Sequence, residues 1–127
     1  MWGWNTYHQI VTELSPEEWV YKDFTTYVIT HNELTSSDKI RFVNTNPGYL
    51  LKKLKEENGK DVWICGGANL VQQLVNEDLI NYYHITVIPI LLGSGIRLFE
   101  NGKHKIKLRL IKTLSYNGMA DLIYTRR

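Results

Sequence analysis

The 127-residue sequence contains a single cysteine, Cys65, so no disulfide bond can form within the chain. Proteins without disulfides are typical of reducing compartments, and we therefore expect a cytoplasmic protein. A reactive thiol needs a basic neighbour that lowers its pKa, and the sequence places none beside Cys65. We interpret Cys65 as an inert, buried small residue.

Long apolar runs and dense blocks of one charge are also lacking. No run reaches the roughly 18 apolar residues of a membrane-spanning helix. The opening stretch, MWGWNTYHQI, has no basic segment followed by an apolar one, so no signal peptide is expected there. The 15 Lys and Arg residues are scattered among 13 Asp and Glu residues. This balance argues against nucleic acid as a partner, and no membrane partner is expected.

Metal-binding patterns are missing as well. The four histidines show no spacing such as H-E-x-x-H, and no metal site is expected. They are His8, His31, His84 and His104. The acidic residues near predicted element ends, Asp61, Glu77, Asp78 and Asp121, are interpreted as solvated, with Asp78 capping or bridging a helix end. No carboxylate stands out as a general acid, so the catalytic residue stays unknown.

What the sequence does contain is an alternation of strand and helix patterns in one domain, residues 1–127. Strands are predicted at 24–30, 40–43, 61–65, 82–92, 105–112 and 120–124, and helices at 7–14, 47–57 and 68–79. Asn5 or Thr6 is expected to cap the first helix, Asn46 caps the second and Asn58-Gly59 ends it. Asn117-Gly118 predicts a hairpin. The order predicts an α/β fold with a mixed central sheet and a C-terminal antiparallel hairpin.

Gly66 and Gly67 stand between an apolar strand, 61–65, and a helix, 68–79. The strand lacks alternation, which predicts burial on both faces. Glycine weakens both strands and helices, so this joint must need bare backbone. A phosphate can approach the free amides at a helix start when no side chain intervenes. A tight turn with close helix–strand packing explains the same two glycines, and both interpretations stay open.

A longer pattern surrounds this joint. It consists of Gly66-Gly67-Ala68-Asn69-Leu70, then Asp78-Leu79-Ile80, then Pro89-Ile90-Leu91-Leu92-Gly93-Ser94-Gly95-Ile96-Arg97-Leu98-Phe99. The pattern resembles the C-terminal reductase domain of the riboflavin-biosynthesis enzyme RibD and stand-alone bacterial proteins of the dihydrofolate reductase-like superfamily. Gly3–Tyr7 is similar to a phosphate-binding helix start of that superfamily, and Tyr27–His31 resembles the strand that ends near the adenosine. The resemblance covers the chain from residue 3 onward.

The resemblance implies a three-layer α-β-α fold of the dihydrofolate reductase type. It implies an NAD(P)H-dependent reductase that transfers hydride to a small pterin- or pyrimidine-like heterocycle, as dihydrofolate reductase and 5-amino-6-(5-phosphoribosylamino)uracil reductase do. A dinucleotide would lie across the carboxyl edge of the sheet, with its pyrophosphate at two helix starts. The residues expected to line that groove are Gly3, Trp4, Asn5, Thr6, Thr30, His31, Gly66, Gly67, Ala68, Asn69 and Leu70.

At two positions this chain lacks a charged residue that members of the family usually carry. Members that take NADPH usually carry a basic residue where this chain has Trp4, and often another where it has Asn32. A 2′-phosphate needs a cation or a fork of donors, which neither side chain supplies. Lys22 or Arg41 is an alternative source of charge. The resemblance implies NADPH, and the two departures leave open NADH or no cofactor at all.

The superfamily normally carries a further segment ahead of the part that this chain resembles, with a central strand, an active-site loop and the usual catalytic acid. We therefore expect a fold incomplete at its N-terminal side, through a late start, a natural truncation or strand exchange with a partner. Open sheet edges favour association, so a homodimer is expected. The alternative function is a non-catalytic nucleotide- or flavin-binding protein, or a truncated, inactive oligomer of the same fold.

One further motif, a glycine-containing loop, has two interpretations. Gly93-Ser94-Gly95 is either a loop that closes over substrate or a turn before Arg97-Leu98-Phe99, whose Leu and Phe side chains would plug the core. Tryptophans are expected in the core, apart from Trp4, which would face the cofactor groove.

Overall fold

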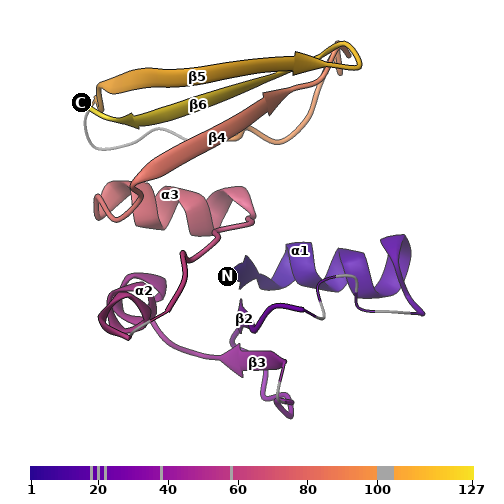
Figure 1. Ribbon diagram of the computed structural model, residues 1–127. Helices are drawn as coiled ribbons and strands as arrows, with labels where there is room; N and C mark the ends of the chain where they lie inside the picture. The colour runs from indigo at the N-terminus through magenta and orange to yellow at the C-terminus, as the bar shows by residue number, and fades with distance from the viewer. Residues whose placement is uncertain (18, 20, 22, 38, 58, 100–104) are drawn as a thin grey trace.

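The computed structural model describes residues 1–17, 19, 21, 23–37, 39–57, 59–99 and 105–127 (Figure 1). The predictions for Lys22, Asn58 and His104 lie outside the described residues. The described part combines helices with parallel and antiparallel strands, which confirms the predicted α/β class. Its strands form two separate three-stranded sheets, one parallel and one antiparallel.

The first sheet is parallel and has the order β1-β2-β3. Its strands are β1 Trp2–Gly3, β2 Thr26–Ile29 and β3 Ile40–Val43. The latter two lie within predicted strands, where β-branched and aromatic residues favour a pleated, half-buried surface. Nothing in the sequence pattern predicts β1, because two residues are too few to show any alternation.

The first helix starts earlier than the sequence predicts. α1 spans Trp4–Gln9 and continues as a π-helical segment, η1 Ile10–Leu14, with Gly3 at the N-cap. The prediction that Asn5 or Thr6 caps this helix is wrong, because both residues lie inside its first turn. The helix therefore begins directly at the carboxyl end of β1.

The other two helices follow the predictions closely. α2 spans Pro47–Glu56, and the Asn46 side chain accepts a hydrogen bond from the Tyr49 amide at 3.1 Å, as a helix cap does. α3 spans Ala68–Asn76, shorter than the predicted 68–79. The main buried cluster joins both helices to the start of the chain through Met1, Leu50, Leu51, Leu70 and Leu74. Within the described residues, no helix has the length and apolar character that crossing a membrane requires.

The prediction for segment 61–65 is wrong in two respects. The segment is not a regular strand, although it runs beside β1: the Cys65 amide donates to the Met1 carbonyl at 3.0 Å, and the Met1 amino group donates to the Trp63 carbonyl at 2.7 Å. It is also not buried on both faces, because Trp63 is 55% exposed. Segment 61–65 is bonded along one edge, and its other side borders a cavity.

The second sheet is antiparallel and has the order β4-β6-β5 (Figure 1). Its strands are β4 Tyr82–Val87, β5 Leu108–Tyr116 and β6 Met119–Arg126. The predicted hairpin is confirmed: Asn117 and Gly118 have φ angles of 49° and 77°, as the favoured two-residue hairpin turn requires. β4 ends before the predicted Leu92, and β5 is displaced toward the hairpin relative to the predicted 105–112.

The segment after β4 stays on the surface. Leu98 and Phe99 are 51% and 41% exposed, so the prediction that they plug the core is wrong. The Phe99 ring lies 6.4 Å from the ring of Tyr83, at the rim of the cavity that both residues line. Without that core contact, Gly93-Ser94-Gly95 is either a loop that closes over substrate or a plain turn, and both stay predictions.

Asp121 lies at the centre of the second sheet and is only 6% exposed, so its interpretation as a solvated residue is wrong. The Thr86 hydroxyl donates to its carboxylate at 2.6 Å, and His84 Nε2 lies 3.7 Å away. These contacts, the Thr86 hydrogen bond above all, hold the pKa of the Asp121 carboxyl below its ordinary value of 3.8. Asp78, in contrast, forms the predicted bridge near a helix end, to Arg126 at 2.7 Å.

The lowered pKa of Asp121 predicts a pH dependence of stability. A carboxyl whose pKa is lower in the folded state stabilises the fold above its unfolded pKa, and this stabilisation is lost as the pH falls toward the folded value. We expect the free energy of unfolding to fall below pH 3.8, and to fall less steeply in Asp121→Asn. Urea titrations at a series of pH values check this. Equal slopes for both proteins would contradict it.

Candidate functional site

The two glycine-containing helix starts lie against each other. The Gly3 amide donates to the Gly66 carbonyl at 2.6 Å, at the point where β1 passes into α1. A Cβ atom added at Gly67 would lie 2.9 Å from Thr6 Oγ1, and one added at Gly3 would lie 3.3 Å from the Gly67 amide nitrogen. Gly66 has a φ angle of 133°, which side chains disfavour. Close packing therefore accounts for glycine at positions 3 and 67, and the backbone angle accounts for glycine at position 66. The packing brings α1 and α3 together at their N-termini.

Both helix starts leave their first amides without side-chain caps. The N-cap residues are Gly3 for α1 and Gly67 for α3, and neither forms a capping hydrogen bond through a side chain. Neither first turn contains an acidic residue. Free amides and the positive end of the helix dipole favour an anion at such a place.

Thr30 and His31 follow β2 at the same edge of the parallel sheet. Gly3 pairs with Ile29, so the next residue, Thr30, lies beside the start of α1. Thr30 is 4% exposed, and its hydroxyl accepts a hydrogen bond from the Asn32 amide at 3.0 Å. His31 is exposed, with Nδ1 3.0 Å from the Asn44 side-chain oxygen. The structure thus gathers most of the predicted site residues at one carboxyl edge.

Three of the predicted site residues have side chains that are buried in the core, bonded within a helix or exposed to solvent. Leu70 is 5% exposed and belongs to the core, so only its backbone lies near the helix start. The Asn69 side chain accepts a hydrogen bond from Gln73 at 2.8 Å and is directed along α3. Asn5 is exposed on the first turn of α1.

Trp4 packs on the outside of the same edge. Its ring centroid lies 5.2 Å from that of His8 and 6.5 Å from that of Phe42 on β3. Trp4 is half-buried by these contacts. It therefore borders the end of the site at which Phe42 forms part of a pocket.

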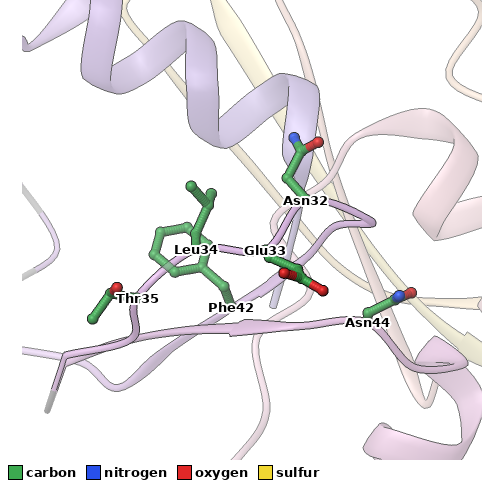
Figure 2. Close-up of a pocket in the computed structure, with 6 residues that line it drawn as sticks. All are labelled: Asn32, Glu33, Leu34, Thr35, Phe42 and Asn44. Atoms are coloured by element: carbon green, nitrogen blue, oxygen red, sulfur yellow. The ribbon is translucent and has the colours of Figure 1, made fainter.

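That pocket lies beyond the ends of β2 and β3 and has a volume of about 400 Å³. Figure 2 shows its lining residues, which come from the loop after His31, from β3 and from the residue that follows β3: Asn32, Glu33, Leu34, Thr35, Phe42 and Asn44. Among the described residues that line the pocket, one is acidic and none is basic. No pattern in the sequence marks Glu33 or Asn44, because the pocket forms only where the loop after β2 folds against β3.

Cys65 precedes the glycine joint and is half-buried. Burial raises the pKa of its thiol, and the charge of the Met1 amino group opposes this only in part. A raised pKa lowers the thiolate fraction, which supports the interpretation of Cys65 as inert. Among the described residues, no group of three or more His, Cys, Asp or Glu side chains is placed to hold a metal ion.

The chain has the fold of the dihydrofolate reductase-like proteins. Two helix starts lie at the carboxyl edge of a parallel sheet, and an antiparallel hairpin follows. A solved structure described as a putative riboflavin biosynthesis protein from Shewanella sp. PV-4 is similar, with a TM-score of 0.83 and 25% identity, covering 99% of this chain and 72% of that one. The dihydrofolate reductase of Schistosoma mansoni shares the fold, with a TM-score of 0.59 and 15% identity over 99% of this chain and 73% of that one.

The RibD C-terminal domain family matches residues 4–120, and the chain belongs to this family. A relative, YwjB of Bacillus subtilis (strain 168), is 38% identical over 127 residues, covering 98% of this chain and 71% of YwjB. These matches confirm the resemblance on which the predicted fold was based.

Proposed function

We propose that the protein is an NAD(P)H-dependent reductase that transfers hydride to a small pterin- or pyrimidine-like heterocycle. The observation that carries this proposal is the meeting of two uncapped helix starts at Gly3 and Gly67, in a chain of the RibD C-terminal domain family. Free amides placed next to each other suit the two phosphates of a dinucleotide. The reaction class is taken by analogy from proteins of the same fold, among them the dihydrofolate reductase of Schistosoma mansoni.

The residues at the glycine joint fit a pyrophosphate. A residue larger than glycine at position 67 would place its Cβ 2.9 Å from the Thr6 hydroxyl, so Gly67 lets the starts of α1 and α3 lie this close together. The Thr6 hydroxyl is itself a donor next to the start of α3. The other proposed contacts are backbone amides of Trp4, Asn5, Ala68, Asn69 and Leu70, with Thr30 and His31 at the neighbouring strand end. A bound nicotinamide supplies the hydride, and these residues bind and orient it.

The 400 Å³ pocket supports NADH as the cofactor. In dinucleotide-binding sites an acidic residue accepts a hydrogen bond from the ribose hydroxyls of NADH, whereas a basic residue accommodates the extra phosphate of NADPH. Glu33 supplies the acidic group here, and no basic side chain lines the pocket in the part of the chain that the structure describes. Arg41 neighbours Phe42 on β3, and alternation along a strand directs their side chains to opposite faces. Arg41 is therefore a poor substitute for the missing cation.

The protein is proposed to act as a cytoplasmic homodimer. Its single free cysteine suits a reducing compartment. The segment after β4 presents large apolar side chains to solvent, including Leu91, Leu92 and Ile96, which are 101%, 78% and 92% exposed. Contiguous exposed apolar side chains mark interaction surfaces. Sedimentation velocity at micromolar concentration checks this, and a monomer at every concentration would contradict it.

Cofactor oxidation tests the proposed reaction. The chain is mixed with NADH or NADPH and a panel of oxidised pterins and ribosylaminopyrimidines, including 5-amino-6-(5-phosphoribosylamino)uracil for a role in riboflavin biosynthesis. We expect loss of the nicotinamide absorbance with at least one substrate. Binding of the cofactor without oxidation would favour the non-catalytic alternative. Absence of binding by a folded chain would overturn the proposal.

A further inference from the structure

Strand pairing in the second sheet gathers basic side chains that lie apart in the sequence. Arg109 on β5 pairs with Thr125 on β6, and two positions further along the Arg127 amide donates to the Lys107 carbonyl at 3.1 Å. Lys112 pairs with the residue two positions before Thr125. Because alternate residues of a strand share a face, and paired residues lie on the same face, these four cations lie on one face of the sheet. All four are exposed, and no ion pair joins any of them to another described residue.

Two exposed tyrosines lie on the same face. Tyr82 on β4 pairs with Thr125, and Tyr116 at the end of β5 pairs with Met119. The two tyrosines are 68% and 48% exposed, whereas Tyr83, on the opposite face, is only 7% exposed. The sheet forms the top of the described structure in Figure 1, with α3 below it. We call this surface the basic face, and it comprises Tyr82, Lys107, Arg109, Lys112, Tyr116 and Arg127.

Asp121 lies at the centre of the basic face, but hydrogen-bond donors cover its charge. It is 6% exposed, and its carboxylate accepts hydrogen bonds from Thr86 at 2.6 Å and from the Tyr116 hydroxyl. These donors reduce its repulsion of an anionic partner. The hydrogen bond from Tyr116 also holds that ring in place, so less conformational entropy is lost when a partner packs on it.

Exposed cations beside exposed aromatic rings are the features by which proteins bind single-stranded nucleic acid. A strand whose phosphates follow Lys107, Arg109 and Lys112 along β5 would place its bases over β6. β4 lies about 10 Å from β5, two strand spacings away, so these bases would extend toward Tyr82. A duplex offers the same phosphates but keeps its bases stacked on one another. A second copy of this chain would bring like charges into contact, which opposes association.

We propose that the basic face binds single-stranded nucleic acid, with the phosphates along β5 and the bases stacked on Tyr82 and Tyr116. The spread of Lys and Arg along the sequence argues against such a partner, but the pairing of β5 with β6 brings four of them together. The contacts are to phosphates and to the faces of bases, so little sequence preference is expected. The inference does not rest on the proposed reaction, because the basic face contains none of the residues proposed to bind the cofactor.

Fluorescence anisotropy with labelled 12-nucleotide oligomers of deoxythymidine and of uridine tests the proposal. Four phosphate contacts predict that affinity falls about 50-fold when salt is raised from about 50 to about 200 mM. Binding of both oligomers, or of one alone, supports the proposal and shows whether DNA, RNA or both are bound. Failure to bind either oligomer at low salt would overturn it, as would equal affinity for a duplex of the same length. Binding of phosphatidylglycerol vesicles but of neither oligomer would instead identify the face as a membrane-binding surface.

Two pairs of matched variants test the location of binding. We expect Lys112→Glu to weaken binding about tenfold, and Lys52→Glu, at an exposed position of α2, to leave it nearly unchanged. Tyr82→Ala should also weaken binding about tenfold, equivalent to about 1.4 kcal/mol for one lost stacking contact, and Tyr82→Phe should restore it. Tyr49→Ala removes a ring of similar exposure, 64%, from α2 and serves as the control. Equal weakening by the variants on α2 would overturn the proposal.

Discussion

Replacing Gly67 with aspartate is expected to raise the dissociation constant for NADH about 100-fold, which corresponds to about 2.7 kcal/mol. The new carboxylate would stand at the uncapped start of α3, where the pyrophosphate is proposed to bind. It would repel the phosphates and satisfy the free amides in their place. Its Cβ would also press on the Thr6 hydroxyl, which lies 2.9 Å from that position.

Quenching of tryptophan fluorescence measures the dissociation constant, since Trp4 lies at the same helix start. The control is Gly59→Asp, which adds the same charge at an exposed position where a Cβ meets nothing within 4 Å. Circular dichroism shows whether each variant is folded. An unchanged dissociation constant in folded Gly67→Asp would mean that the two glycines serve packing alone.

The sequence predicts local features of this fold well, because each is specified by neighbouring residues. The Asn46 cap, the Asn117-Gly118 turn and the strand Ile40–Val43 depend on side chains within a few positions of each other. The errors occur where the outcome depends on a distant segment. The apolar run 61–65 has the composition of a central strand, but one of its sides borders a cavity instead of another strand.

The candidate site likewise has a part that the local sequence predicts and a part that depends on distant segments. Gly66 and Gly67 stand out in the sequence because glycine is unfavourable beside a strand and a helix. Their contact with Gly3 and Thr6 joins segments some sixty positions apart, which no local pattern reveals. The pocket with Glu33 is less predictable still, since its residues have no special spacing. Only the resemblance to a family predicted that these positions share one edge.

The charge of Glu33 is expected to decide the choice of cofactor, and Glu33→Lys should shift the ratio of NADPH to NADH affinity about tenfold toward NADPH. The variant removes an acceptor for the ribose hydroxyls and supplies a cation for the 2′-phosphate. At an effective dielectric constant near 20, two unit charges about 4 Å apart interact by about 4 kcal/mol, and exposure of Glu33 reduces this considerably through solvent and salt.

The measurement is a fluorescence titration of each variant with both cofactors at low and high salt. Glu33→Gln separates the two effects, because it removes the negative charge without adding a cation, and should give an intermediate ratio. Glu56→Lys changes net charge as much as Glu33→Lys does, but it lies on the exposed side of α2 and should leave the ratio unchanged. An equal shift in Glu56→Lys would mean that overall charge, and not the pocket beside β3, determines the preference. A wild-type chain that already favours NADPH would mean that the 2′-phosphate binds outside this pocket.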